Sequence, residues 1–251
     1  MFVDLNADLG ETTAGNPVAD DAAMLDMVSS ANVACGFHAG DAHSIAQTLH
    51  AAARAGVTVG AHVGYNDIAG FGRRFMDYDP AELADETTYQ IGALSALAKA
   101  AGTQVKYVKP HGALYNAIVH DKKQAEAVVA GIRAFGDLPV MLLPGGVAVD
   151  VAEKAGLTVI REAFADRGYN PDGTLVSRRS PKALLHDVNE VVARVVQVAE
   201  SGSVTAIDGS VLNVDAQSIC THGDSPGAVE MLRSVLGELT KRNITVRSVL
   251  A

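Results

Sequence analysis

A junction between a helix and a strand recurs four times along this 251-residue chain. In each copy a helical pattern ends in small residues, one glycine follows, and a β-branched strand begins. The four copies lie at residues 54–63, 100–108, 154–164 and 200–208. Their glycines, which fit the left-handed backbone position that ends a helix, are Gly56, Gly102, Gly156 and Gly202. A chain that alternates strands and helices in this way favours a parallel sheet in an α/β fold.

Seven strand–helix units can be counted from the hydrophobic pattern. The predicted strands are Phe2–Asn6, Ala31–Ala34, Val57–His62, Val105–Lys109, Val140–Leu143, Thr158–Glu162 and Ser218–Thr221. Amphipathic helices are predicted to begin at Asp79, at Ser180 and near Pro226, and Val204–Val214 is typical of an inserted β-hairpin. Seven units can close into a barrel or remain an open doubly wound sheet, and we favour an irregular TIM-like (β/α)7 barrel. No linker divides the sequence, so residues 1–251 are expected to form a single domain.

The composition narrows the classes of protein. The net charge is −9 and the isoelectric point is about 5.3, which argues against a surface for nucleic acid or anionic membrane. The first residues lack the pattern of a signal peptide, and no apolar run approaches the ~20 residues that span a bilayer. Two cysteines, Cys35 and Cys220, do not make a disulfide framework or a zinc ribbon. The cytoplasm is therefore the expected compartment.

Half of the eight histidines fall where a hydrophobic strand ends and a loop begins: His38, His62, His111 and His222. In a parallel barrel every strand delivers its carboxyl end to the same face, and that face carries the chemistry. Any single one of these histidines is more simply explained as a core or capping residue. Because four share the same position relative to a strand, we expect them to converge in space.

Alternation along the strands places further polar side chains inside the barrel. In the first strand Asp4, Asn6 and Asp8 share one face, and such groups are costly to bury unless each finds a partner or a ligand. The same parity, continued past the strand ends, predicts a polar rim at the carboxyl ends of the strands. Its members are Asp8, His38, His62, Lys109, His111, Glu162, His222 and Asp224.

This rim supports two kinds of chemistry. An aspartate with two histidines is a common ligand set for zinc or another divalent ion, and the candidates here are Asp8, His38 and His62. Alternatively, histidine–carboxylate pairs perform acid–base chemistry without a metal, with Lys109 stabilising an oxyanion or a phosphate. The sequence has no HExxH and no paired CxxC, so spacing alone leaves both interpretations open.

A loop rich in glycine and arginine, DIAGFGRRF, follows the third predicted strand. Arg73 and Arg74 in this loop can bind an anionic group, or they can be solvated arginines on an exposed loop. The phosphate-binding patterns GxxxxGK[ST] and GxGxxG are absent, so no local motif indicates a nucleotide site.

Six segments together resemble the LamB/YcsF family, which includes the A subunit of prokaryotic 5-oxoprolinase. They are DLNADLGE at 4–11, SSANVACGFHAGD at 29–41, VGAHVGYNDIAGFGRR at 59–74, VKPHGALYN at 108–116, REAFADRGYNPDGTLVSR at 161–178 and ICTHGDSPGAV at 219–229. They run in order from end to end of the chain. The resemblance implies a barrel related to carbohydrate deacetylases. It also implies ATP-dependent opening of 5-oxoproline to L-glutamate together with B and C subunits.

The rim and the matching segments define the candidate site. The candidate catalytic residues are Asp8, His38, His62, Lys109, His111 and Glu162, and the candidate substrate-binding residues are Asn6, Asn32, Tyr65, Arg73, Arg74, His222 and Asp224. The resemblance implies ATP with Mg²⁺ at the level of the complex, and the missing phosphate-binding loop places ATP on the partner subunits. A divalent metal in this chain also stays open. Two other functions stay open: a stand-alone metal-dependent deacetylase or amidohydrolase, and a non-catalytic subunit that binds a small acid or regulates the complex.

Overall fold

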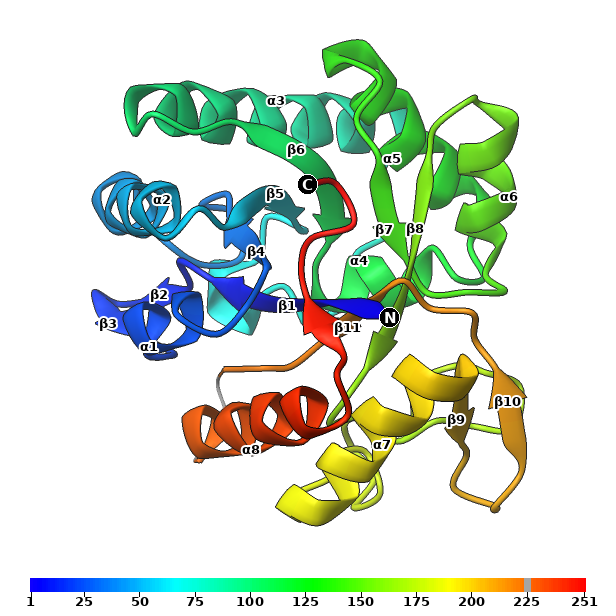
Figure 1. The fold of residues 1–251 in the computed structure, drawn as a ribbon. Coiled ribbons are helices and arrows are strands. Elements are labelled where there is room, and N and C mark those ends of the chain that lie inside the picture. The colour runs from blue at the N-terminus through cyan, green and yellow to red at the C-terminus, as the bar shows by residue number, and fades with distance from the viewer. Residues whose placement is uncertain (224–226) are drawn as a thin grey trace.

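The computed structural model describes residues 1–223 and 227–251. Its main sheet closes on itself, because β11 at one end of the strand order also pairs with β1. Around the ring lie the parallel strands β1 (Phe2–Leu9), β4 (Ser30–Ala34), β5 (Thr58–Val63), β6 (Val105–Pro110), β7 (Val140–Leu142), β8 (Val159–Phe164) and β11 (Ser218–Cys220). The predicted seven-stranded parallel barrel is confirmed, and the open doubly wound alternative is wrong for this chain (Figure 1).

The longer helices pack around the outside of the barrel (Figure 1). The helices are α1 (Asp21–Leu25), α2 (Ala42–Ala55), α3 (Pro80–Ala100), α4 (Gly112–Ala117), α5 (Lys122–Phe135), α6 (Val147–Lys154), α7 (Val188–Ser201) and α8 (Ala228–Lys241), with a 3-10 turn η1 (Ile68–Gly70). Several begin after an aspartate whose carboxylate accepts hydrogen bonds from first-turn N–H groups, for example Asp41, Asp79 and Asp187. Within the described residues, no helix combines the length and apolarity that a membrane crossing requires.

The predicted boundaries agree with most of the structure. The four junction glycines have positive φ, as their place at helix ends predicts. The helix predicted from Ser180 is wrong, because α7 begins at Val188 after its capping residue Asp187. Residues 180–187 instead fold back along the loop that follows β8, where Leu185 N–H donates to the carbonyl of Asp166. The last helix, α8, begins at Ala228, and Pro226 lies outside the described residues.

Short strands complete the structure. The strands β9 (Ser203–Thr205) and β10 (Val211–Asn213) pair antiparallel, which confirms the predicted hairpin. A second small pair, β2 (Thr12–Thr13) and β3 (Asn16–Pro17), lies in the loop after β1. The last strand, β12 (Thr245–Val246), adds to the beginning of β1 outside the closed ring.

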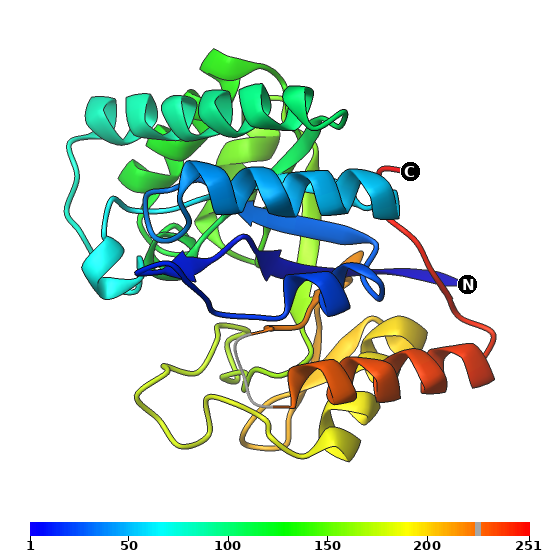
Figure 2. The same ribbon diagram turned by 90° about the vertical axis from the view of Figure 1, so that its left-hand side faces the viewer.

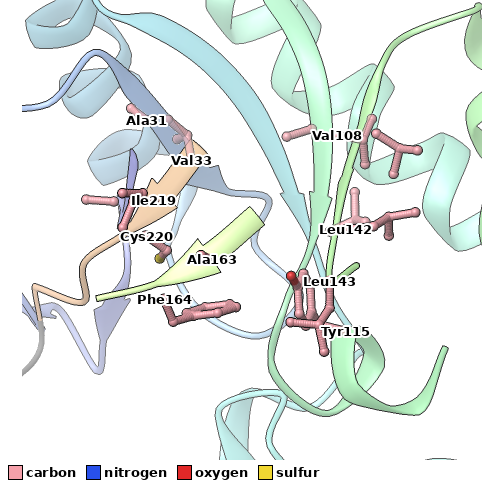
Figure 3. Packing of buried hydrophobic residues seen from close by; sticks show 14 of the residues in the cluster. Ala31, Val33, Val108, Tyr115, Leu142, Leu143, Ala163, Phe164, Ile219 and Cys220 are labelled. Carbon is pink, nitrogen blue, oxygen red and sulfur yellow. The ribbon is translucent and has the colours of Figure 1, made fainter. Parts of the chain in front are cut away.

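The apolar core lies between the barrel and its helices. Alternate strand residues face this layer, and Leu5, Val59, Val108 and Ile219 are fully buried in it. Figure 3 shows part of the cluster, including Val108, Ile219 and Leu142 on three different strands. Burial of these side chains on the outer face leaves the other face of each strand to the barrel lumen.

The lumen changes character along the barrel axis. Near the amino ends of the strands, Tyr107, Met141 and Ile160 form a separate buried cluster against which Val249 and Leu250 pack. The segment after β12 therefore covers this end of the barrel, and Figure 1 shows it crossing in front of the strands. Both termini lie at this end, whereas the long loops after β5 and β8 extend from the opposite end (Figure 2).

Candidate active site

The polar side chains of β1 point into the lumen at every second position, as parity predicts. Asp4 lies deepest, and its carboxylate accepts hydrogen bonds from the hydroxyls of Ser30 at 2.8 Å and Ser218 at 2.7 Å. Burial raises the pKa of the Asp4 carboxyl. Asp4 does not line the cavity at the rim; it ties β1 to its two neighbouring strands.

Lys109 on β6 is the centre of the polar network. Its ammonium lies 2.9 Å from Asp8 Oδ1 and 3.0 Å from Glu162 Oε1, although the side chain is only 2% exposed. Burial alone would lower the pKa of Lys109, but the carboxylates, Asp8 foremost, hold it well above its ordinary value. Burial likewise opposes ionisation of Asp8, whose pKa is nevertheless held well below its ordinary range by His62 and Lys109. One buried cation therefore sits between two carboxylates.

Two asparagines orient this network from within the barrel. Asn6 Nδ2 donates to Glu162 Oε1 at 3.0 Å, and its Oδ1 accepts from Asn32 Nδ2 at 2.7 Å. Asn32 Nδ2 also donates to Asp8 Oδ1 at 2.8 Å, and the Tyr107 hydroxyl donates to Asn32 Oδ1 at 2.6 Å. Both asparagines are fully buried and lie beneath the cavity. They position the charged groups rather than line the cavity.

A cluster of three histidine rings and one carboxylate, which we call the histidine centre, lies beside Asp8 at the carboxyl ends of the strands. It comprises Glu11, His38, His62 and His111. His38 Nε2 lies 2.9 Å from Glu11 Oε1, and His111 Nδ1 lies 3.0 Å from His62 Nε2. Burial lowers the pKa of both His38 and His111. Their rings are therefore held in the neutral form that ligates metals.

Gly72 makes the close packing of this centre possible. The His38 and His111 rings stack with their centroids 3.7 Å apart. A Cβ at position 72 would lie 2.7 Å from His38 Cβ and 2.8 Å from His111 Cδ2, and the residue has a φ of +59°. A side chain there would meet both a steric clash and backbone strain. The DIAGFGRRF loop therefore serves first to cover the histidines.

A cavity of about 40 Å³ opens beside the histidine centre and the Lys109 network. Asp8, Lys109, His111 and Tyr115 line it. Its volume corresponds to a few water-sized spheres, which suits a compact group and not a nucleotide. Asp8 is 12% exposed and Lys109 only 2%, so the aspartate is the more accessible of the pair.

Arginines surround the mouth of the cavity. Arg73, Arg167 and Arg178 line it and also line an adjoining outer groove of about 660 Å³. Arg167 is itself buried, and its Nη2 donates to the carbonyl of Val176 at 2.8 Å. Burial lowers the pKa of Arg167 to about 10, so its guanidinium remains charged at neutral pH. The mouth is therefore suited to a carboxylate or a phosphate.

His222 has a fixed tautomer at the same mouth. Arg178 Nη2 donates to His222 Nε2 at 3.0 Å, so the protonated nitrogen is Nδ1, which faces both carboxylate oxygens of Asp166 at 2.9 Å. Burial would raise the pKa of Asp166, yet His222 holds it below its ordinary value. An Asp–His–Arg relay therefore connects the wall of the cavity to the loop after β8.

The structure does not bring all the predicted residues together. Tyr65 is fully buried away from the cavity, where its ring stacks on Tyr78 and its hydroxyl donates to Gln124. Its parity is opposite to that of His62, so it faces the helices. Arg74 pairs with Asp67 and its side chain is 66% exposed, outside the cavity lining. Asp224 lies outside the described residues.

The remaining predicted residues are close to one another, and sequence reasoning missed several of their partners. Those partners are Glu11, Tyr107, Asp166, Arg167 and Arg178. Glu11 and Asp166 come after their strands have ended, where alternation no longer predicts direction. Of the three predicted metal ligands, His38 and His62 belong to the histidine centre. Asp8 lies outside it, and its Oδ1 forms an ion pair with Lys109.

The reactivity of Cys35 and Cys220 tests whether these two side chains are buried in the folded protein. Both thiols are buried, and burial raises the pKa of each. We expect neither thiol to react with Ellman's reagent in the native protein, because the reactive species is the exposed thiolate. Both should react after unfolding in guanidinium chloride. Prompt titration of one thiol in the native protein would contradict this burial.

The fold and the rim together define a parallel barrel whose acid–base groups and histidines gather at the carboxyl ends of the strands, the usual place of the active site in barrel enzymes. The chain belongs to the LamB/YcsF family, whose model matches residues 3–251.

Known proteins similar to this chain agree with that assignment. It is 70% identical over 251 residues to the A subunit of 5-oxoprolinase from Corynebacterium jeikeium, covering 100% of this chain and 97% of the relative. The crystal structure of a lactam utilization protein from Thermus thermophilus superposes with a TM-score of 0.93 at 42% identity, covering 98% of this chain and 99% of that one. A peptidoglycan N-acetylglucosamine deacetylase, at 12% identity and a TM-score of 0.50 over 99% of this chain and 86% of that one, shares the fold alone.

Proposed function

We propose that this chain is the A subunit of a 5-oxoprolinase that opens the lactam of 5-oxoproline to L-glutamate while ATP is hydrolysed to ADP and phosphate. The observation that carries the proposal is the 70% identity along the whole chain to a relative named as the A subunit of 5-oxoprolinase. The similarity to a lactam utilization protein, at 42% identity, supports the same class of substrate. The enzyme works in the cytoplasm with B and C subunits.

The cavity suits a small acid with a polar ring. 5-Oxoproline carries a carboxylate, and Arg73 and Arg178 at the cavity mouth are the groups to receive it. The ring then lies toward Asp8 and Lys109. The outer groove, with its arginines, leaves room for a phosphate on the substrate. We therefore assign carboxylate recognition to Arg73 and Arg178, which line the cavity, whereas Arg74 lies outside its lining.

The ATP requirement follows from the chemistry of the amide. An unstrained five-membered lactam is a poor electrophile, so water attacks its carbonyl slowly. Phosphorylation of the amide oxygen makes the ring carbon electrophilic, so that water adds to it. The C–N bond then breaks to leave a γ-glutamyl phosphate, and a second water molecule releases the phosphate and gives glutamate. ATP with Mg²⁺ binds on the partner subunits in this scheme, since the sequence lacks a phosphate-binding loop. This chain then holds the activated lactam for hydrolysis.

The proton transfers belong to the accessible groups of the rim. Asp8 faces the cavity and accepts a proton from the attacking water. Lys109 stays charged next to it and stabilises negative charge that develops on the carbonyl oxygen or on the departing phosphate. His222, whose Nδ1–H donates to Asp166 and whose Nε2 accepts from Arg178, holds Arg178 at the cavity mouth. The proton that Asp8 took from the water passes to the ring nitrogen as the C–N bond breaks.

Reconstitution tests the function. The chain alone, incubated with 5-oxoproline, ATP and Mg²⁺, should form neither glutamate nor ADP at an appreciable rate, because its sequence contains neither of the common phosphate-binding motifs. Addition of the B and C subunits should restore both products, measured by enzyme-coupled assays of glutamate and ADP.

Three outcomes would overturn the proposal. ATP-dependent glutamate release by the chain alone would require a nucleotide site within it. ATP-independent release of acetate or an amine would favour a stand-alone deacetylase or amidohydrolase. Full activity of a reconstituted complex that carries Asp8→Asn and Lys109→Met in this chain would give the chain a binding or regulatory role only.

A further inference from the structure

We propose that the histidine centre binds one divalent transition metal ion of the zinc class through Glu11, His38, His62 and His111. One ligand atom from each residue can be chosen so that all four lie within 4.8 Å of one another, and all four side chains are buried. The inference stands on the geometry of the rings, and it holds whichever substrate the cavity receives.

Two backbone carbonyls fix the tautomers of two rings. His62 Nδ1 lies 3.0 Å from the carbonyl oxygen of Lys109, and His111 Nε2 lies 2.9 Å from that of Phe71. A carbonyl oxygen only accepts, so each of these nitrogens carries the hydrogen. In the neutral rings the lone pairs are then on His62 Nε2 and His111 Nδ1.

These two lone pairs face each other. His62 Nε2 and His111 Nδ1 are 3.0 Å apart, and with the other nitrogen of each ring donating to a carbonyl, a hydrogen lies between them only if one ring takes up a further proton. The arrangement is repulsive unless a cation lies at the point where they converge. Metal-binding histidines have this same pattern, in which the second ring nitrogen donates to a carbonyl or carboxylate and orients the ligand.

Glu11 and His38 bring the number of candidate ligand atoms to four. Glu11 Oε1 lies 2.9 Å from His38 Nε2, 3.4 Å from His111 Nδ1 and 3.8 Å from His62 Nε2. Zinc–nitrogen bonds of about 2.0–2.1 Å place the ligand atoms of a tetrahedral site about 3.3 Å apart. The three distances from Glu11 Oε1 to the histidine nitrogens are therefore close to the separation expected for ligands of one ion. Within the described part of the chain no group pairs with His38 Nδ1, so no second partner fixes the tautomer of this ring, and its Nε2 faces Glu11.

A second cluster competes less well for the ion. Asp8, Cys220 and His222 also offer ligand atoms close together. Lys109 Nζ, however, donates to Asp8 Oδ1 at 2.9 Å and to Cys220 Sγ at 3.2 Å. An ammonium therefore already stands between two of its three members. The ligand atoms of the histidine centre, by contrast, lie next to one another and to Asp8, with no ammonium between them in the described part of the chain.

An ion at this centre would face the cavity, because Glu11, His62 and His111 line its wall. It would there polarise a carbonyl oxygen or a bound water molecule of the substrate complex. A single proton shared by His62 and His111 is the alternative way to relieve the repulsion between the lone pairs, and only a binding measurement separates the two.

Metal binding by the tag-free protein tests the proposal. After treatment with a chelator, the protein is titrated with Co²⁺ and followed by visible absorption, and then with Zn²⁺ followed by calorimetry. We expect one equivalent of either ion, the absorption bands of tetrahedral Co²⁺, and a melting temperature that rises with the metal concentration. Failure of the intact, folded protein to take up Co²⁺ or Zn²⁺ would overturn the proposal in favour of the shared proton.

Variants locate the ion. Glu11→Gln keeps the shape of the side chain and should weaken Zn²⁺ binding at least about 100-fold. His50→Ala replaces an exposed histidine on α2 and should leave it unchanged. Cys220→Ser separates the two clusters: unchanged affinity is expected, and loss of binding in this variant would place the ion at the second cluster. Unchanged affinity in Glu11→Gln, with circular dichroism showing a folded protein, would also contradict the proposal.

Discussion

Lys109→Met is expected to destabilise the folded protein by about 3–5 kcal/mol, because it leaves Asp8 and Glu162 as buried carboxylates without their cation. The loss is measured as a shift of the urea midpoint at constant m-value. In this explanation the loss of stability comes from the two carboxylates that stay buried without a cation. Adding Asp8→Asn and Glu162→Gln to Lys109→Met should therefore recover a large part of the lost stability.

A matched control lies on the same strand. Lys106 also belongs to β6 but is exposed, so Lys106→Met should change stability by no more than about 0.5 kcal/mol. Equal stability of the Lys109→Met and Lys106→Met proteins would show that the buried ion triad contributes nothing to the folded state.

Asp8→Asn in the reconstituted enzyme should reduce glutamate formation by about 10²–10⁴-fold, because the amide cannot take a proton from water. The replacement keeps the size of the side chain and leaves Glu162 as a partner of Lys109. The far-ultraviolet circular dichroism spectrum should therefore be that of the parent. The rate is measured as kcat for glutamate release with saturating ATP.

The control for this variant is Asp150→Asn, which changes an exposed carboxylate on α6 and should leave the rate unchanged. A folded Asp8→Asn protein that supports turnover at the parent rate would remove Asp8 from the proton transfers. The role of general base would then have to be reassigned among the other groups that line the cavity.

Strands were predicted more accurately than loops, for a physical reason. A β-branched run bounded by a glycine leaves the backbone few alternatives, so Val105–Lys109 was within one residue of the observed strand. The segment from Ser180 contains Leu184 and Leu185 with helical spacing, but backbone hydrogen bonds to the loop after β8 outweigh that local pattern. Pairing partners far away in the sequence decide such segments, and periodicity does not report them.

The same limit applies to the candidate site. Asp8, Lys109 and Glu162 lie on strands, where alternation predicts direction, and the structure places both carboxylates within hydrogen-bonding distance of the ammonium. Glu11 was not predicted because it follows Gly10, which has a φ of +70° and turns the chain after β1. Strand alternation therefore does not predict the direction of its side chain. Tyr65 was assigned from its motif against its own parity, and it packs among the helices instead.

Closure of the barrel joins the two ends of the chain, and this has a consequence for how the protein acquires its structure. Asp4 pairs in register with Ser218, and Phe2 with Thr245. Contacts between residues so far apart in the sequence slow folding, because closing a very large loop costs entropy before the strand-pairing contacts can compensate for it. During synthesis β1 is made before the other strands of the ring, and its closing partner β11 is made last of them. We therefore expect the nascent chain to remain an open, incomplete sheet, with the polar face of β1 unsatisfied, until β11 has left the ribosome.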